Sequence, residues 1–509
     1  MSTSTGTTTR ATSQAVTGSP VVVIGAGPVG LAAAAHLLER GLEPVVLEAG
    51  DRVGAAVRAW GHVRLFSPWR YDLDAAAVRL LEPTGWAAPE PTGLPTGAEL
   101  VEDYLAPLAA TEALAGRIRT GARVTAVTRV GMDKTHARGR ELRPFLVRVE
   151  QTDGTVVDHH ARAVLDTSGT WGQPNPLGSS GLPARGEAQA APFLAGPLPD
   201  VLGADRARFA GRRVLVVGAG HSAANTLLNL VTLAEQDPTS DDADGPATRI
   251  VWAVRGASVA RAYGGGDHDG LPARGALGAR LREAVRTGRI ELVTEVTIAA
   301  LRPDAERGEV TVVAETPCGQ RELTVDVIAP ATGFRPDLGV LRELRLDLDP
   351  GVEASARLAP LIDPEFHSCG TVPPHGAAVL AHPETGFFIA GTKSYGRAPT
   401  FLLATGYEQV RSIAAHLAGD EQAAANVELD LPETGVCSSA PSTTAADGTP
   451  QIDESAGGSC CGTGSSAEAR RLTPSAAPDL GFATGSAHGR SGEAARAATG
   501  TISASGCCG

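Results

Sequence analysis

Two glycine-rich runs constrain this chain more than any other feature of its sequence, because each lies between a β-branched stretch and a helical stretch. The first, VVVIGAGPVG at residues 21–30, places Gly25, Gly27 and Gly30 in the spacing G-x-G-x-x-G. In a βαβ unit the first glycine allows a tight turn, the second admits a pyrophosphate, and the third lets the helix pack closely on the strand. The positive dipole end of that helix then faces the phosphates. The run predicts a dinucleotide-binding site.

The residue at the end of the next expected strand indicates which dinucleotide this site takes. We expect strands at Val21–Ile24 and Pro44–Leu47, joined by a helix at Leu31–Arg40, and Glu48 follows the second strand. A carboxylate there can accept hydrogen bonds from a ribose diol, and it would repel a 2′-phosphate. The first unit therefore suits FAD or NAD. The alternative is a glycine-rich turn in an ordinary βαβ unit.

The second run, VLVVGAGHSA at residues 214–223, repeats the pattern. Gly218 and Gly220 keep the first two glycine positions, whereas Ala223 occupies the third. Ser222, in the first turn of the expected helix, is also expected to bind the cofactor. Because a simple dehydrogenase needs one such unit, two units in one chain predict a bound flavin and a diffusing nicotinamide.

A basic residue distinguishes the second unit from the first. The strand expected at Ile250–Val254 ends in Arg255, where the first unit has an acid. A guanidinium can bind a 2′-phosphate through two hydrogen bonds, so the sequence favours NADPH over NADH. A solvated charge at the end of a strand is the alternative for Arg255. We expect His221 to face solvent or the cofactor rather than to act as a base.

The alternation of strands and helices predicts an α/β chain with two Rossmann-like, doubly wound dinucleotide-binding domains. We expect a disordered leader at 1–19, an FAD-binding domain at 20–190 and 331–420, and an NAD(P)H-binding domain at 205–330. Residues 431–509 are rich in Ser, Thr, Gly, Ala and Pro. Such a segment buries too little apolar surface to offset its ordering entropy, so we predict a disordered, cysteine-containing tail.

The overall composition argues against several classes of partner. The 509 residues carry a net charge of −13, which disfavours a nucleic-acid partner, because phosphate binding relies on clustered Lys and Arg. No run reaches the roughly 18 consecutive apolar residues of a membrane helix, and the first residues lack the apolar core of a secretory signal. We expect a cytoplasmic enzyme that acts on a small molecule.

Four further stretches resemble the flavin-containing monooxygenase-like branch of the flavoproteins with two dinucleotide-binding domains. They are VGAAVRAWGHVRLFSPWRYDL at 53–73, AVLDTSGTWGQPNP at 163–176, IAPATGFRPDL at 328–338 and GFFIAGTKSYGRAPTFLLATGYEQVRSIAAHL at 386–417. The resemblance is strongest to the flavin-binding monooxygenases encoded in actinobacterial arsenic-resistance clusters. It implies transfer of a hydride from NADPH to FAD, followed by reaction with O2 or another acceptor.

The resemblance also implies roles for particular residues. Trp60 would lie in the segment that runs along the flavin, and Gly391 would end the strand of the final FAD segment. Thr392 stands where the family commonly has an Asp that holds the ribityl chain, so its hydroxyl would do part of that work. Lys393 is the one catalytic candidate, as a fixed cation near the charge of the reduced flavin. The alternative for Lys393 is a phosphate or surface contact.

Three further residues depart from the family pattern. Asp166 and Ser168 differ from the usual strand-and-turn sequence, and Leu215 occupies the position of the His in the monooxygenase signature F-x-G-x-x-x-H. The missing His puts Baeyer–Villiger and N-oxygenating chemistry in doubt.

Two cysteines lie in the part of the chain that we expect to fold. Cys318 and Cys369 are far apart in sequence, and no C-x-x-C pair occurs there. We expect both to be buried structural thiols, which argues against a thioredoxin-reductase role.

Two adjacent cysteine pairs occur in the tail, Cys460 with Cys461 and Cys507 with Cys508. Neighbouring Cα atoms are about 3.8 Å apart, below the usual disulfide span, so such a pair better suits one soft ion. The terminal pair resembles the tail of mercuric reductases, and arsenite is the expected ligand. Two alternatives to the monooxygenase-like enzyme follow: a thiol-tail metalloid-binding protein, or a metalloid reductase that uses the flavin domain. Incidental thiols are the simplest alternative for the pairs.

Overall fold

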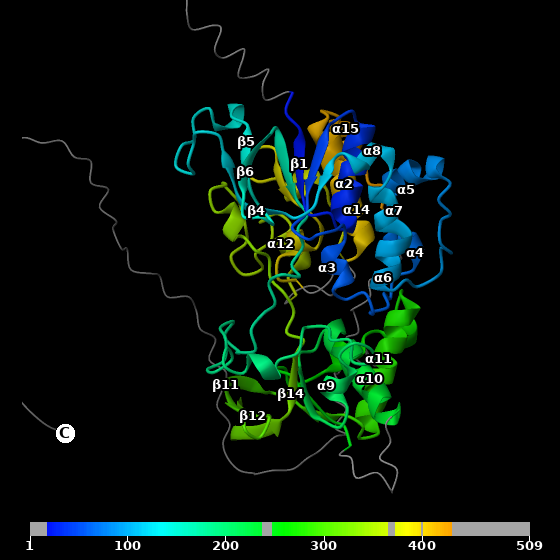
Figure 1. The fold of residues 1–509 in the computed structure, drawn as a ribbon, viewed down its shortest axis with the longest axis vertical. Helices are drawn as coiled ribbons and strands as arrows, with labels where there is room; N and C mark the ends of the chain where they lie inside the picture. Colours follow the sequence, from blue (N-terminus) through cyan, green and yellow to red (C-terminus); the bar gives the residue numbers. More distant parts are fainter. Residues whose placement is uncertain (1–17, 237–246, 365–371, 399–400, 430–509) are drawn as a thin grey trace, which may run out of the picture. The chain divides into compact units, whose positions relative to one another are not determined.

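The computed structural model describes residues 18–236, 247–364, 372–398 and 401–429. Each glycine-rich run leads out of a strand in a parallel sheet, and a helix follows it (Figure 1). The expected α/β class with two Rossmann-like units is confirmed by these two sheets. Among the described residues, no helix is both long enough and apolar enough to cross a membrane.

The first parallel sheet has the strand order β15-β7-β1-β2-β3. Its strands are β1 (Val21–Ile24), β2 (Pro44–Leu47), β3 (Ile118–Arg119), β7 (Ala163–Asp166) and β15 (Phe387–Ile389). The β1 strand is buried throughout because its four apolar residues lie in the middle of the sheet. Since β15 pairs with β7, the sheet is assembled from two separate stretches of chain.

The second parallel sheet has the order β10-β9-β8-β14. Its strands are β8 (Arg213–Val217), β9 (Arg249–Ala253), β10 (Glu291–Val293) and β14 (Val327–Pro330). The helices α10 (His221–Gln236) and α11 (Pro272–Arg286) belong to the same unit, and α10 packs on β8 and β9. Apolar residues of α10 and α11 share a core with alternate residues of β8 and β9.

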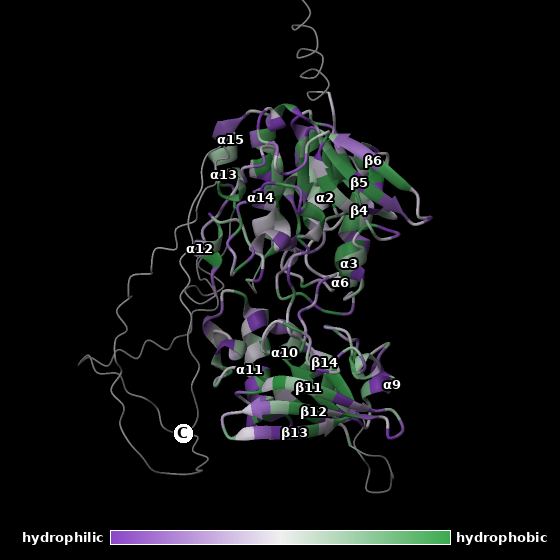
Figure 2. Cartoon of the chain, turned by 90° about the vertical axis from the view of Figure 1, so that its left-hand side faces the viewer, coloured by the Kyte–Doolittle hydropathy of each residue, from purple (hydrophilic) through white to green (hydrophobic). Residues whose placement is uncertain are grey.

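Each parallel sheet is accompanied by a three-stranded antiparallel sheet, which the sequence analysis did not predict. The first contains β4 (Ala122–Arg129), β5 (Phe145–Gln151) and β6 (Val156–Ala161), and the second contains β11 (Thr297–Asp304), β12 (Glu309–Thr316) and β13 (Gly319–Val325). Figure 2 shows hydrophilic residues along the edge strands β6 and β13, most of whose residues are exposed or partly exposed. The buried faces of the two antiparallel sheets share hydrophobic cores with the parallel sheets.

Helices cover the first sheet, and two of them start near its glycine-rich turn. The long ones are α2 (Pro28–Glu39) and α14 (Leu403–Leu417), which lie side by side (Figure 1). The short ones are α3 (Ala55–Arg58), α4 (Trp69–Asp72), α5 (Ala75–Leu81), α6 (Gly97–Glu99), α7 (Ala106–Ala109), α8 (Glu112–Ala115), α12 (Ala359–Ile362), α13 (Ala377–Leu380) and α15 (Glu421–Ala425). A π-helical turn at Leu100–Leu105 joins α6 to α7, and α9 (Arg206–Phe209) precedes β8.

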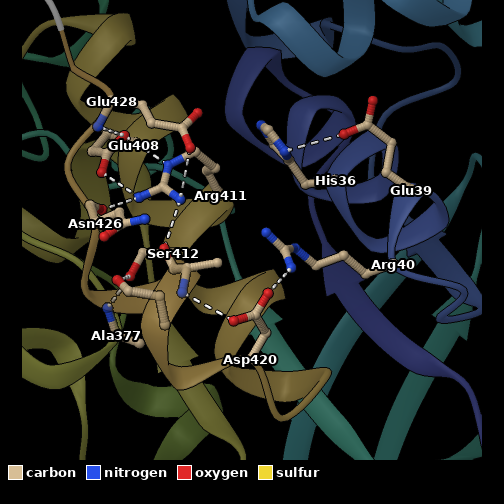
Figure 3. A network of polar contacts seen from close by, with 12 residues as sticks. His36, Glu39, Arg40, Ala377, Glu408, Arg411, Ser412, Asp420, Asn426 and Glu428 are labelled. Atoms are coloured by element: carbon tan, nitrogen blue, oxygen red, sulfur yellow. Dashed lines mark hydrogen bonds and ion pairs between the residues drawn. The ribbon is translucent and has the colours of Figure 1, made fainter.

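A polar network fastens the end of the described chain to α14 (Figure 3). The buried Arg411 pairs with Glu408 on the same helix at 2.7 Å and donates to the Ala423 carbonyl of α15 at 2.9 Å. Ser412 donates to the Ala424 carbonyl at 2.6 Å and accepts from the N–H of Ala377 at 3.0 Å. These contacts hold α13 and α15 against α14.

A buried charged triad joins the first antiparallel sheet to the segment before β15. The Glu384 carboxylate accepts from the side chains of Arg129 at 2.7 Å and Arg140 at 2.8 Å. The Arg129 guanidinium also lies 3.5 Å from the centre of the Phe145 ring. Burial by itself would raise the pKa of Glu384, but the two guanidinium groups outweigh it and hold that pKa below its usual value.

Replacement of Glu384 by Gln would leave two buried guanidinium groups without a countercharge. We expect Glu384→Gln to lower the free energy of unfolding by about 3–5 kcal/mol, measured by urea denaturation at pH 7. The control is Asp158→Asn, which removes an exposed pair with Arg148 and should cost less than about 1 kcal/mol. Equal small losses in both variants would contradict the structural role of the triad.

Candidate functional site

The turn between β1 and α2 is shaped by contacts that only glycine permits. Gly25 has φ +99°, and a Cβ on Gly30 would lie 2.0 Å from the carbonyl oxygen of Gly25. The helix begins after Gly27, no side chain caps it, and a Cβ on Gly27 would meet no atom within 4 Å. Uncapped N–H groups in front of open space fit a pyrophosphate.

Glu48 reaches back from the end of β2 to this turn. Its carboxylate accepts from the N–H of Ala26 at 2.7 Å and from the N–H of Gly50 at 2.8 Å. A carboxylate offers about four lone-pair positions, so two remain for the hydroxyl groups of a ribose. The side chain is half-buried, and its position beside the turn suits that role.

The turn between β8 and α10 repeats this geometry. Gly218 has φ +129°, and a Cβ there would lie 2.1 Å from the carbonyl oxygen of Ala331, at the end of β14. A Cβ on Gly220 would meet no atom within 4 Å, so this turn also faces open space. Ala223 is fully buried, and Ser222 is half-buried in the first turn of α10. The second turn can therefore hold a second pyrophosphate.

Arg255 lies two residues beyond the end of β9, on the second unit. Its side chain is exposed, and among the described residues it makes one long hydrogen bond, 3.4 Å to the carbonyl of Ser179. The guanidinium thus keeps most of its donors for a ligand, as a 2′-phosphate site requires.

His221 is the first residue of α10. The expectation was that it faces solvent or the cofactor, and the structure shows that solvent reaches only part of it. Its half-buried ring lies 5.0 Å from the ring of Phe66, centre to centre. Burial and then the charge of Arg274 lower the pKa of His221 to about 4, so its ring is neutral at pH 7. Arg274 is itself buried, paired with Asp269 at 3.2 Å, and lies 5.4 Å from the Phe66 ring centre. Sequence reasoning missed this cluster, because its members are up to about 200 residues apart.

Lys393 is buried, so the surface alternative in the sequence analysis is wrong. It lies in the 3-10 turn Gly391–Tyr395 after β15, and its Nζ is 2.7 Å from Oδ2 of Asp166 and 3.1 Å from Oγ of Ser168. Asp166 ends β7, in register with the last residues of β1 and β15. In an open parallel sheet, ligands bind at the carboxyl ends of the strands on either side of the point where the strand order reverses, here β1 and β7. The ammonium is therefore beside the predicted crevice.

The two residues before Lys393 differ in exposure. Gly391 is buried with φ +72°, a Cβ there would lie 3.3 Å from the side chain of Val29, and its N–H donates to Gln409 at 2.7 Å. Thr392 is exposed, so its hydroxyl is accessible to a ligand. The final FAD segment predicted from the sequence thus packs on the first turn of α2.

Trp60 is half-buried and packs on α6. A Cβ on Gly97, the first residue of α6, would lie 2.8 Å from the Trp60 ring, so glycine is needed for this contact. The structure places Trp60 in the first unit, and its predicted contact with a flavin stays a prediction.

Asp72, in α4, is a buried carboxylic acid that the sequence analysis did not single out. One carboxyl oxygen accepts from the Ser67 hydroxyl at 2.8 Å, whereas the other is buried without a hydrogen-bond partner among the described residues. Burial raises its pKa to about 7, against the smaller opposite effect of Ser67. No motif marks such a residue, because the shift depends on the helices that enclose it.

The cysteine predictions have mixed outcomes. Cys318 is exposed in the turn between β12 and β13, so the prediction of a buried thiol is wrong for it; a two-residue turn has no core around it. Cys369 and the four cysteines of the two tail pairs, Cys460, Cys461, Cys507 and Cys508, lie outside the described residues. Within the described ranges, no group of three or more His, Cys, Asp or Glu side chains could hold a metal ion.

The part of the chain around the first glycine-rich turn matches a known protein family. Residues 20–87 match the model of the FAD dependent oxidoreductase family. The stretch that carries the first glycine-rich turn is thus similar to FAD-dependent oxidoreductases. No protein with a curated description matches the sequence.

Solved structures share the fold over most of the chain. A bacillithiol disulfide reductase from Bacillus cereus is 18% identical, with a TM-score of 0.57, and the match covers 79% of this chain and 99% of that one. The FAD-bound cadaverine monooxygenase of desferrioxamine biosynthesis from Erwinia amylovora is 14% identical, with a TM-score of 0.53 and coverage of 86% and 99%. An ornithine N-hydroxylase from Kutzneria is 15% identical, with a TM-score of 0.51 and coverage of 79% and 99%. At these identities the likeness establishes the fold alone.

A methyl group at Gly30 would force α2 away from the turn. We expect Gly30→Ala to lower the bound FAD per chain at least tenfold after purification, measured from the flavin absorbance, because the pyrophosphate site is displaced. The control is Gly116→Ala, where φ is −85° and a Cβ meets no atom within 4 Å. Full flavin content in Gly30→Ala would contradict the assigned geometry.

The buried acid predicts a pH dependence of stability. The folded-state pKa of Asp72, about 7, lies above its usual value of 3.8, so its contribution to stability is complete below pH 4 and is lost as the pH rises to 7. We expect Asp72→Asn to abolish this slope and to be more stable than the wild type at pH 8, by on the order of 2–4 kcal/mol. Parallel stability profiles of the two proteins between pH 4 and 8, from urea denaturation, would refute this.

Proposed function

We propose that this protein is an NADPH-dependent flavoenzyme of the monooxygenase-like type, which reduces FAD with NADPH and passes the electrons to O2 or to another acceptor. The proposal rests chiefly on the duplicated turn: two parallel sheets each present a glycine-lined turn and a helix N-terminus to open space. One site suits a resident cofactor, and the other suits its electron donor.

The residues around the two turns divide the cofactors between them. At the first turn, the N–H groups of α2 bind the FAD pyrophosphate, and Glu48 accepts hydrogen bonds from the adenosine ribose and repels a 2′-phosphate. At the second turn, α10 binds the NADPH pyrophosphate, and Arg255 binds the 2′-phosphate. When bound, FAD supplies the capacity to accept a hydride and to react with an acceptor.

Proteins of similar fold differ in their electron acceptor, since they include a cadaverine monooxygenase, an ornithine N-hydroxylase and a bacillithiol disulfide reductase. Cys318, the one cysteine among the described residues, is exposed in a turn of the second antiparallel sheet, which does not support a dithiol mechanism. Leu215, at the position of the signature His, is fully buried inside β8, so its side chain does not serve the site. These observations favour O2 as acceptor with a substrate outside the common monooxygenase classes.

We link this activity to arsenic chemistry through the resemblance of the sequence to enzymes of arsenic-resistance clusters. In this proposal the tail pairs Cys460–Cys461 and Cys507–Cys508 bind arsenite, because thiolates prefer soft ions. The alternatives are a thiol-tail metalloid-binding protein whose flavin domain is a redox sensor or scaffold, and a metalloid reductase in which tail and flavin cooperate.

The experiment is to measure NADPH oxidation and O2 uptake by the purified yellow protein, with and without arsenite, in the full chain and after deletion of residues 431–509. O2 uptake that survives the deletion supports the monooxygenase-like enzyme. NADPH oxidation that needs both arsenite and the tail supports the reductase. A protein that binds FAD and oxidises no NADPH under any of these conditions refutes the proposed function.

The choice of NADPH depends on Arg255. We expect Arg255→Gln to raise the KM for NADPH about 10- to 100-fold, because a charge-assisted contact with the 2′-phosphate is lost. The KM for NADH, which lacks that phosphate, should change less than twofold and serves as the internal control. An equal rise for both nucleotides would show that Arg255 does not read the 2′-phosphate.

A further inference from the structure

Three residues that stand apart in the sequence form one buried polar network in the structure. Asp166 and Ser168 depart from the family's strand-and-turn pattern, and Lys393 follows the last strand of the first sheet. The Lys393 ammonium donates to Oδ2 of Asp166 at 2.7 Å and to Oγ of Ser168 at 3.1 Å. The Ser168 hydroxyl donates in turn to Oδ1 of Asp166 at 2.6 Å. The network is therefore a closed ring of three side chains.

The ring has a sealed end and an open end. The side chains of Lys393 and Asp166 are 1% and 0% exposed, whereas Ser168 is exposed. Fully buried charges are costly unless they are paired and hydrogen-bonded, and here the ammonium pairs with the carboxylate and donates to the Ser168 hydroxyl. A ligand can reach the ring at the exposed Ser168.

The open end touches the phosphate-binding turn. A Cβ on Gly25 would lie 3.0 Å from Cα of Ser168, so no other residue separates Ser168 from the first glycine of the turn. Thr167, next to Ser168, donates through both its N–H and its hydroxyl to the carbonyl of Ile24 in β1. On the other side, Gly391 packs on Val29 in the first turn of α2. The ring thus rests against both halves of the turn-and-helix unit.

We propose that Ser168 binds the diphosphate of FAD, and that Lys393, held by Asp166, is the positioning residue that makes Ser168 a strong donor. This inference rests on the proposed FAD site. A hydroxyl has one rotatable hydrogen, so Ser168 can turn its O–H from Asp166 to a phosphate oxygen while it still accepts from Lys393. An ammonium that donates to the hydroxyl oxygen polarises the O–H bond, which strengthens the bond to an anion.

The test measures binding rather than turnover. FAD affinity is measured on apoprotein of the full chain by quenching of flavin fluorescence, and ADP and riboflavin are measured by competition. We expect Ser168→Ala to weaken the binding of FAD and ADP about 10- to 100-fold, as loss of a charge-assisted hydrogen bond predicts. The affinity for riboflavin, which has no phosphate, should change less than about threefold.

The role of Lys393 needs a variant that does not leave a buried charge unpaired. Lys393→Met combined with Asp166→Asn removes both charges and keeps an amide oxygen for Ser168. We expect this pair of substitutions to weaken the binding of FAD and ADP about tenfold. The triple variant, which adds Ser168→Ala, should bind both no more weakly than Ser168→Ala alone. Ser168→Thr, which keeps the hydroxyl, should restore most of the affinity.

A matched control comes from the other buried ion pair near α14. Arg411→Met with Glu408→Gln neutralises a pair that is also buried but serves α15 (Figure 3), so it should lower stability without a change in FAD affinity. FAD and ADP affinities within twofold of the wild type in both the Ser168 and the Lys393–Asp166 variants would overturn the inference. Additive losses would show that Lys393 acts separately from Ser168. Failure of the wild-type apoprotein to bind FAD would instead refute the proposed function.

Discussion

The close approach of a backbone turn to the strand or helix beside it is the constraint on which the rest of this structure depends. At Gly30 a single added carbon would lie 2.0 Å from the carbonyl of Gly25, and at Gly218 it would lie 2.1 Å from the carbonyl of Ala331. No side chain fits such gaps, so the first turn packs directly on α2 and the second packs directly on the residue that follows β14. The open space at Gly27 and Gly220 follows from the same geometry, and every assignment of a cofactor to this chain rests on it.

Buried charges then organise the first unit around its turn. The Glu384 carboxylate joins the antiparallel sheet to the segment that enters β15, and Arg411 joins α14 to the end of the described chain. The third buried pair, Lys393 with Asp166, differs because its neighbour Ser168 is exposed at the turn itself. Buried ion pairs contribute little net stability, since desolvation offsets the attraction, and their value lies in fixing one arrangement. In this unit they fix the contacts between segments that are distant in the chain.

How much could be predicted depended on whether a residue's role was local. The strands at Val21–Ile24 and Pro44–Leu47 were predicted to the residue, because β-branched runs bounded by glycine or proline are local signals. The two antiparallel sheets were missed, since their strands carry no motif. The prediction for Cys318 was wrong for a similar reason: burial depends on neighbours in space, and a turn residue has few. Asp72 and the contact of Phe66 with His221 could not have been found, because both arise from helices and turns that meet only in the folded chain.

The sequence by itself determined the two turns and the strands that lead into them. It also determined the acidic residue Glu48 and the basic residue Arg255, which follow the second strand of each unit. These features need only the conformational freedom of glycine and the chemistry of a side chain at a strand end. The tertiary structure alone decided that Lys393 is buried beside Asp166, that His221 is neutral, and that Asp72 retains its proton to about pH 7. Each of these depends on the removal of water from a charged group by residues distant in the chain, which no local pattern encodes.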